Sequence, residues 1–189
     1  MPSIPAFTEH GLLPLGAHEA TFAELRESIL VKGPGDIEGW DERWRAHLVH
    51  NAEILVSQLR TVGITEIFLN GSFAETKARP NDIDGYFEVD ARRVATGDLE
   101  RELNALDPYK VWTWDEAQRR PHRGSAKKQL PMWHQYRIEL YPHYPGVVAL
   151  VDQFGVPRQF PSAFRQQRHT GYRKGIVKII SESPSEAAK

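Results

Sequence analysis

The chain has 189 residues, of which 40% are hydrophobic and 26% are charged, a balance that suits one packed domain. It contains no cysteine, which excludes a disulfide framework, a thiolate metal site and a cysteine nucleophile. The apolar runs are too short to cross a bilayer, and the amino terminus lacks a basic region followed by an apolar core. We therefore expect a soluble, cytoplasmic protein with no membrane partner.

The net charge of −1 hides an uneven distribution of charge along the chain. Residues 1–116 carry 11 Lys/Arg and 21 Asp/Glu, whereas residues 117–181 carry 12 and 2. Eleven of these twelve basic residues lie before or after the strand of Glu139: Arg119, Arg120, Arg123, Lys127, Lys128, Arg158, Arg165, Arg168, Arg173, Lys174 and Lys178. This density favours a polyanionic ligand such as a triphosphate or a nucleic acid. The alternative is that these side chains balance the acidic half across the fold.

Two helices are predicted before the first clear strand. Thr21 and Glu24 have the spacing of a capping box, which predicts a short helix to about Val31, ended by the glycines that follow. Residues 41–62 show a helical stripe of apolar side chains, and Gly63 is well placed to terminate that helix. We expect this longer helix to pack beneath a sheet.

The strand predicted at residues 65–69 is β-branched and apolar, and it leads through Asn70 into Gly71-Ser72. Glycine permits a tight turn and a close approach of the backbone. A Gly-Ser turn can therefore bring backbone N–H groups and a small hydroxyl close to a phosphate. Gly71 and Ser72 are candidate nucleotide-binding residues.

The next predicted strand begins with Asp82-Ile83-Asp84 and continues through Tyr86 and Phe87. Alternate residues of a strand face the same side, so the two aspartates would project together while Ile83 enters the core. Paired carboxylates are hard oxygen ligands that suit Mg²⁺. The alternative is a turn in which an aspartate caps backbone N–H groups.

The rest of the chain predicts further short elements. In order, they are a helix at 99–106 capped by Asp98, a strand at 110–114, a basic loop or lid at 116–131, a strand at 136–141 ended by Pro142, a helix at 147–151, a strand at 175–180 and a frayed tail at 181–189.

The order of strand, Gly-Ser turn and Asp-x-Asp strand resembles the nucleotidyltransferase superfamily typified by DNA polymerase β. The resemblance covers about residues 41–141 and implies an α+β fold, a small mixed β-sheet flanked by helices, in a single domain at 1–180. It also implies a third acidic residue on a later strand. Glu139, between apolar neighbours in the strand at 136–141, is the candidate, so Asp82, Asp84 and Glu139 would form a carboxylate triad.

The chain looks most like small, single-domain nucleotidyltransferase-like proteins of bacteria and phages. Residues 13–21 and 173–177 resemble stretches of an uncharacterised family of that kind, some of whose relatives belong to toxin–antitoxin and abortive-infection systems. Those relatives transfer nucleotides to transfer RNA or to a partner protein. Residues 73–77, Phe-Ala-Glu-Thr-Lys, depart from the Ala-Arg-Gly type of sequence that follows the Gly-Ser in many minimal members.

The resemblance implies a metal-dependent transfer of a nucleoside monophosphate from a nucleoside triphosphate to a hydroxyl of RNA or protein. Asp82, Asp84 and Glu139 would hold Mg²⁺ or Mn²⁺, and Gly71 with Ser72 would hold the terminal phosphates. Lys174 is the preferred basic residue for the phosphates and Arg173 the second. Two alternatives are an antitoxin or regulator acting on a partner protein, and an inactive module that binds nucleic acid.

Overall fold

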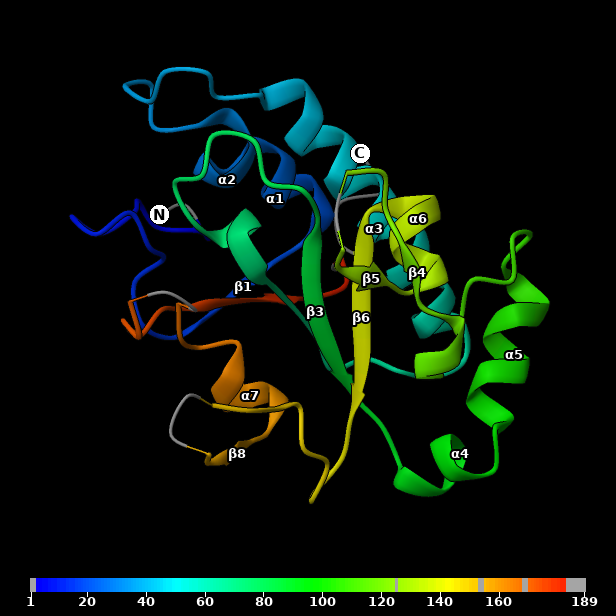
Figure 1. Ribbon diagram of the computed structural model, residues 1–189. Coiled ribbons are helices and arrows are strands. Elements are labelled where there is room, and N and C mark those ends of the chain that lie inside the picture. Colours follow the sequence, from blue (N-terminus) through cyan, green and yellow to red (C-terminus); the bar gives the residue numbers. More distant parts are fainter. Residues whose placement is uncertain (1–2, 125, 153–154, 168–169, 183–189) are drawn as a thin grey trace.

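The computed structural model describes residues 3–124, 126–152, 155–167 and 170–182. Its centre is a five-stranded mixed sheet in the order β1-β9-β2-β3-β6 (Figure 1). The strands are β1 (Ala17–Ala20), β2 (Ile67–Asn70), β3 (Ile83–Glu88), β6 (Ile138–His143) and β9 (Ile176–Ile179). β1 pairs with β9, and β3 with β6, in parallel, while β2 is antiparallel to both of its neighbours. This arrangement confirms the α+β class and the small mixed sheet.

Helices and two small hairpins surround this sheet. The helices are α1 (Phe22–Glu27), α2 (Ile29–Lys32), α3 (Glu42–Thr61), α4 (Ala91–Ala95), α5 (Asp98–Leu106), α6 (Pro131–Tyr136) and α7 (Phe160–Ala163), with 3₁₀ turns η1 (Gly71–Ala74) and η2 (Glu116–Gln118). The hairpins pair β4 (Arg120–Pro121) with β5 (Lys128–Gln129) and β7 (Leu150–Val151) with β8 (Pro157–Arg158).

The long helix α3 forms where the apolar stripe predicted it and covers one face of the sheet. Asp41 caps it by accepting a hydrogen bond from the Trp44 N–H at 2.9 Å. Leu48, Leu55 and other stripe residues are fully buried in the main core, which also contains the inward side chains of the sheet. The helix ends at Thr61, two residues before a glycine with a positive φ.

The alternation of side chains along β3 divides the sheet into two chemically different faces. Ile83 and Phe87 lie in the main core with α3. Tyr86 points to the opposite face, where it joins a smaller aromatic cluster with Phe68 and with Phe160 of α7. Asp84 precedes Tyr86 by two residues on β3 and shares this second face, whereas Asp82 lies just before the strand. That the two aspartates project together stays a prediction.

Three element predictions need correction at their ends. The capping box of Thr21 is present, but the helix stops at Glu27, because Ser28 caps a separate short helix, α2. Asp98 is the first residue of α5 rather than its cap, which is Gly97 in a left-handed conformation. Pro142 does not end β6, because β6 is an edge strand and the missing N–H of a proline leaves no ladder bond unmade at the open edge.

Two predicted elements have a different structure. Residues 110–114 are not a strand, because Lys110 has a positive φ and the backbone of Trp112 bonds to the side chain of Asn104 instead of to a sheet. Residues 147–151 are not a helix, since the Ala149 N–H donates to the Arg158 carbonyl and the segment pairs with β8.

No helix in the described part of the chain is long and apolar enough to cross a membrane. Residues 183–189, most of the predicted tail, lie outside the described residues, as does Arg168.

Candidate functional site

The Gly-Ser turn and the Asp-x-Asp strand meet at one end of the second face of the sheet. Asn70, the last residue of β2, is the register partner of Asp84 on β3. Asp84 is in turn the register partner of Glu139 on β6. Directly paired residues project to the same side of a sheet, so these three polar side chains lie in a row across adjacent strands.

Gly71 brings the turn directly against Asp84. Its φ of +74° belongs to the left-handed region, which glycine adopts without steric cost. A Cβ atom at this position would lie 2.7 Å from Oδ2 of Asp84, so the carboxylate would have to move. The backbone conformation favours glycine here, and its lack of a side chain lets the turn contact Asp84. Ser72 follows in η1 and is partly exposed.

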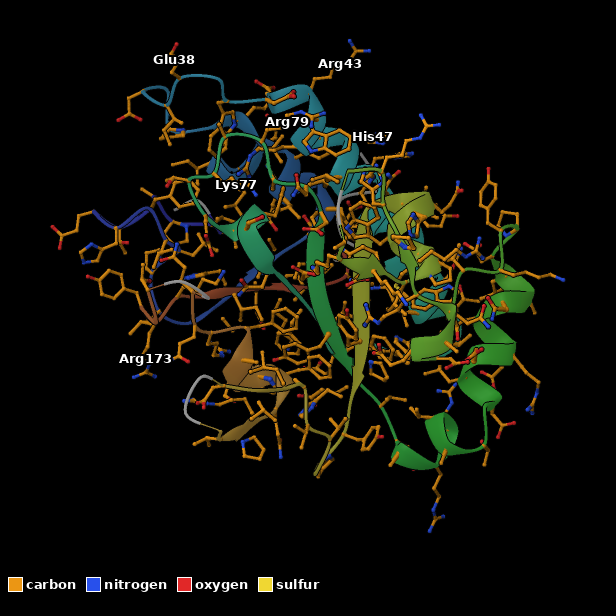
Figure 2. All side chains as sticks on the ribbon, in the orientation of Figure 1. Glu38, Arg43, His47, Lys77, Arg79 and Arg173 are labelled. Atoms are coloured by element: carbon orange, nitrogen blue, oxygen red, sulfur yellow. The ribbon has the colours of Figure 1, made fainter. Side chains whose placement is uncertain are left out.

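Lys174 reaches the same turn from the segment before β9. Its ammonium donates to the Gly71 carbonyl at 2.9 Å and pairs with Glu75 at 2.5 Å, and the residue is only 4% exposed. Lys174 thus lies where the sequence placed a basic residue, although a carboxylate offsets its charge. Arg173 is exposed and projects outward at the margin of the molecule, away from the turn (Figure 2).

Asn70 supplies a buried polar atom beside the aspartates. Its Nδ2 donates to the Gly175 carbonyl at 3.0 Å, which ties the end of β2 to the start of β9. Its Oδ1 is buried and has no hydrogen-bond partner within the described residues. Buried amide oxygens are normally satisfied, so this atom is an exception in the fold.

Asp82 is oriented by α6, a contact that the sequence analysis missed. Its Oδ2 accepts a hydrogen bond from Nε1 of Trp133 at 2.6 Å. The guanidinium of Arg137 stacks 3.9 Å from the Trp133 ring, and its positive charge interacts with the Asp82 carboxylate. Arg137 adopts a left-handed conformation, and its carbonyl accepts the Ile83 N–H at 3.0 Å, which joins α6 to β3. A tryptophan in an apolar stretch gives no signal that its indole N–H faces a carboxylate.

Glu139 occupies the predicted strand position, but protein donors hold its carboxylate. It accepts hydrogen bonds from the Leu130 N–H at 2.9 Å and the Tyr141 hydroxyl at 2.5 Å, and it pairs with Arg119 at 3.5 Å. The residue is 3% exposed. Burial, followed by the Glu139 charge, raises the pKa of the Tyr141 hydroxyl well above its usual range. A metal-binding role for Glu139 stays a prediction.

The donor set beside the turn fits a divalent cation through two carboxylates. Carboxylates are hard oxygen ligands, Asp84 lies in register with Asn70, whose Oδ1 is unpaired within the described residues, and Gly71 leaves room at the Asp84 carboxylate; Asp82 comes two residues earlier in the chain. Throughout the described ranges, no group of three or more acidic or histidine side chains is arranged to hold one ion.

Comparison with known proteins gives a family but no activity. A family model matches residues 5–180, and its description is a family of unknown function, DUF6932. The chain belongs to this family. No curated protein and no solved structure matches it.

The segment between the Gly-Ser turn and β3 is held by a buried arginine that sequence reasoning did not identify. Arg45 on α3 is fully buried and lies 3.9 Å from the Trp40 ring. Its guanidinium donates to carbonyl oxygens of Phe73 at 2.9 Å and Lys77 at 2.6 Å, and also to those of Leu30, Glu75 and Ala78. Burial lowers the pKa of Arg45 to about 9. A polar residue in an apolar helical stripe is the one signal for such a role.

Some of the basic residues of the second half do balance the acidic half. Lys178 on β9 pairs with Glu66 at 3.0 Å and with Glu19 at 3.6 Å, and Lys174 pairs with Glu75. For these two lysines, the structure supports the alternative of charge balance across the fold.

Proposed function

We propose that this chain is a metal-dependent nucleotidyltransferase, which moves a nucleoside monophosphate from a nucleoside triphosphate to a hydroxyl group of RNA or of a protein. The observation that carries the proposal is the contact of the Gly-Ser turn with Asp84. The Cβ position of Gly71 lies 2.7 Å from the Asp84 carboxylate, so a phosphate held by the turn would lie beside Asp84.

In this proposal Asp82 and Asp84 would hold Mg²⁺ or Mn²⁺. The ion would neutralise triphosphate charge and act as a Lewis acid at the reacting phosphate. The Trp133 indole N–H fixes the Asp82 carboxylate, so less conformational freedom is lost when a ligand binds.

The turn would hold the phosphates. Backbone N–H groups after Gly71 and the Ser72 hydroxyl are donors of the kind that bind phosphate oxygens. Lys174 would keep the turn in place through the Gly71 carbonyl, with its positive charge beside the terminal phosphates. Arg173 would contribute charge only at longer range, because its side chain projects outward.

The reaction would be an in-line displacement at the α-phosphorus. The oxygen of the acceptor hydroxyl forms the new bond, the bond from the α-phosphorus to its bridging oxygen breaks, and pyrophosphate leaves. The hydroxyl proton passes to solvent or to a nearby carboxylate. The acceptor would be RNA, including transfer RNA, or a partner protein in a toxin–antitoxin or related role.

One observation favours a second candidate. Because three protein donors hold the Glu139 carboxylate, the chain would lack a third acidic ligand in this arrangement. This favours a protein that retains the fold to bind a nucleotide or a nucleic acid without transferring it.

The test is incubation of the purified protein with each α-labelled nucleoside triphosphate, Mg²⁺ or Mn²⁺, and total RNA or cell protein. The proposal predicts label in RNA or protein with wild type and none with Asp82→Asn. Glu88→Gln is the matched control, because Glu88 is an exposed carboxylate on the same strand. Label that is unaffected by Asp82→Asn would contradict the mechanism, and nucleotide binding without label would support the second candidate.

A further inference from the structure

A concave site lies beside α7, separate from the turn and the aspartates. The cleft has a volume of about 480 Å³. Its lining residues are Arg158, Pro161, Ser162, Arg165, Gln166 and Arg173. Three of these six are arginines, and the other three carry no charge. The cleft therefore concentrates positive charge within a small volume.

Two of the arginines are held in place by contacts outside the cleft. Arg158 binds Asp152 through Nε at 2.9 Å and Nη2 at 2.8 Å. Arg165 donates from Nη1 to the Gly16 carbonyl at 3.0 Å. A guanidinium has five N–H donors, so each of these contacts uses only part of the group. Both side chains are thus oriented in advance, which reduces the entropy lost on binding a ligand.

The backbone fixes the third arginine beside them. Gln166 and Arg173 form an isolated antiparallel bridge, and the Lys174 N–H donates to the Arg165 carbonyl at 2.9 Å. These bonds hold the segment before β9 against the residues that follow α7. Arg173 therefore lines the cleft, although it points away from the Gly-Ser turn.

Within the described residues, Arg158 is the one cleft arginine that forms an ion pair with a carboxylate. Asp152 offsets the charge of Arg158. Burial raises the pKa of the Tyr86 hydroxyl to about 12. The positive charge of Arg165 lies close enough to Tyr86 to oppose this rise. Like charges held together are unfavourable unless an anion joins them. Guanidinium groups match the geometry of phosphate oxygens, and the Ser162 hydroxyl and Gln166 amide add neutral donors.

We propose that this cleft binds a phosphate group. The phosphate can come from a free polyphosphate or nucleotide, or from the backbone of an RNA strand, since both present the same oxyanion. The cleft contains neither Gly71 nor the aspartates, so binding there requires no metal ion and no transfer reaction. The proposal assigns Arg158, Arg165 and Arg173 to one ligand. The number of basic residues in 117–181 does not by itself show which of them share a ligand.

The test is isothermal titration calorimetry at low salt in the presence of EDTA. One arm uses inorganic triphosphate, and the other uses a single-stranded RNA of about 12 nucleotides. Wild type is expected to bind at least one probe, and Arg173→Gln and Arg165→Gln should each weaken binding by about tenfold. Arg43→Gln is the matched control, because Arg43 is an exposed arginine on α3 and the change removes the same charge. Its binding should equal that of wild type.

The two arms identify the source of the phosphate. Binding of triphosphate alone assigns a free polyphosphate or nucleotide, and binding of RNA assigns a backbone. Because Arg173 is exposed, its substitution is expected to leave the fold intact, which thermal unfolding checks. Absence of binding by wild type to both probes, or equal binding by wild type and a folded Arg173→Gln variant, would overturn the proposal. Asp82→Asn should bind as wild type does, so failure of the transferase proposal leaves this result unchanged.

Discussion

The two faces of the central sheet have the same backbone but opposite chemistry. On the face toward α3, Ile83, Phe87 and their neighbours on β2, β6 and β9 form one continuous apolar core. On the other face, the aromatic cluster around Tyr86 fills only part of the surface, and Asp84 and Glu139 come two residues before the tyrosines of that face on β3 and β6. A single alternation along β3 thus separates the residues that stabilise the fold from those available for chemistry.

This difference predicts whether a substitution should change stability or activity. Changes on the apolar face should lower stability, whereas changes at the aspartates should lower activity and leave stability nearly unchanged. The buried Arg45 and the turn residue Gly71 connect the two faces, and the predictions below separate these contributions.

The largest effect is expected for Asp84→Asn. Loss of a carboxylate ligand should lower the rate of nucleotide transfer by about 10³-fold, equivalent to about 4 kcal/mol of transition-state stabilisation. The melting temperature should change little, because Asp84 is partly exposed and lies outside the apolar core. Transfer assays and thermal unfolding check both statements. A transfer rate equal to that of the Glu88→Gln control would refute the claim that the face with Asp84 serves activity.

Arg45→Met should have the largest effect on stability. The methionine preserves part of the apolar stem but leaves carbonyl groups of residues 73–78 without their donor. We expect a loss of about 3 kcal/mol in the free energy of unfolding, as for other broken buried networks. Denaturant unfolding measures the loss, and hydrogen exchange should show faster exchange in residues 73–78. A change below about 0.5 kcal/mol, the usual range for surface substitutions, would contradict the role assigned to Arg45.

Gly71→Ala and Gly63→Ala form a matched pair. Both glycines have a positive φ, of +74° and +84°, but a Cβ at Gly63 meets nothing within 4 Å, whereas a Cβ at Gly71 meets the Asp84 carboxylate. Each variant should lose about 1 kcal/mol of stability through backbone strain. Only Gly71→Ala should also lose transfer activity or metal binding. Equal behaviour of the two variants in both assays would show that the turn does not act on Asp84.

The smallest effect is expected at high pH. The pKa of the Tyr141 hydroxyl is raised in the fold, so the folded protein keeps a proton that the unfolded chain releases above its ordinary pKa of about 10. The stability contribution of Tyr141 is therefore complete below about pH 10 and falls as pH rises further. Tyr141→Phe should make this alkaline decline shallower. Urea unfolding from pH 8 to pH 11 measures it, with the exposed Tyr172→Phe as control. An identical decline in wild type and Tyr141→Phe would contradict this account.

The sequence predicted most of the central elements because their signals are local. The apolar stripe of α3, the capping box at Thr21 and the alternation around Ile83 each depend on a few neighbouring residues. The register that aligns Asp84 with Glu139 does not follow from these local signals, because it depends on the parallel pairing of β3 with β6. The irregular path at residues 110–114 was not predictable in this way, because a side chain on α5 bonds to its backbone.

The surroundings of the candidate site depend on contacts between residues distant in the sequence. Trp133 meets Asp82, and Tyr141 with Leu130 meets Glu139, through the arrangement of α6 and β6. Charge counts also could not separate Lys174, which has a carboxylate partner, from the arginines that line a cleft. Such pairings become visible only when the strands and helices are placed in space.

The most direct test of the central claim is the binding of Mn²⁺, followed by electron paramagnetic resonance, in the presence of a non-hydrolysable nucleoside triphosphate analogue. The account predicts that wild type and Glu88→Gln bind the ion–nucleotide complex, and that folded Asp82→Asn and Asp84→Asn variants bind it at least about tenfold more weakly. Equal binding by all four proteins, or no binding by wild type, would contradict the claim that Asp82 and Asp84 form a metal site beside the Gly-Ser turn.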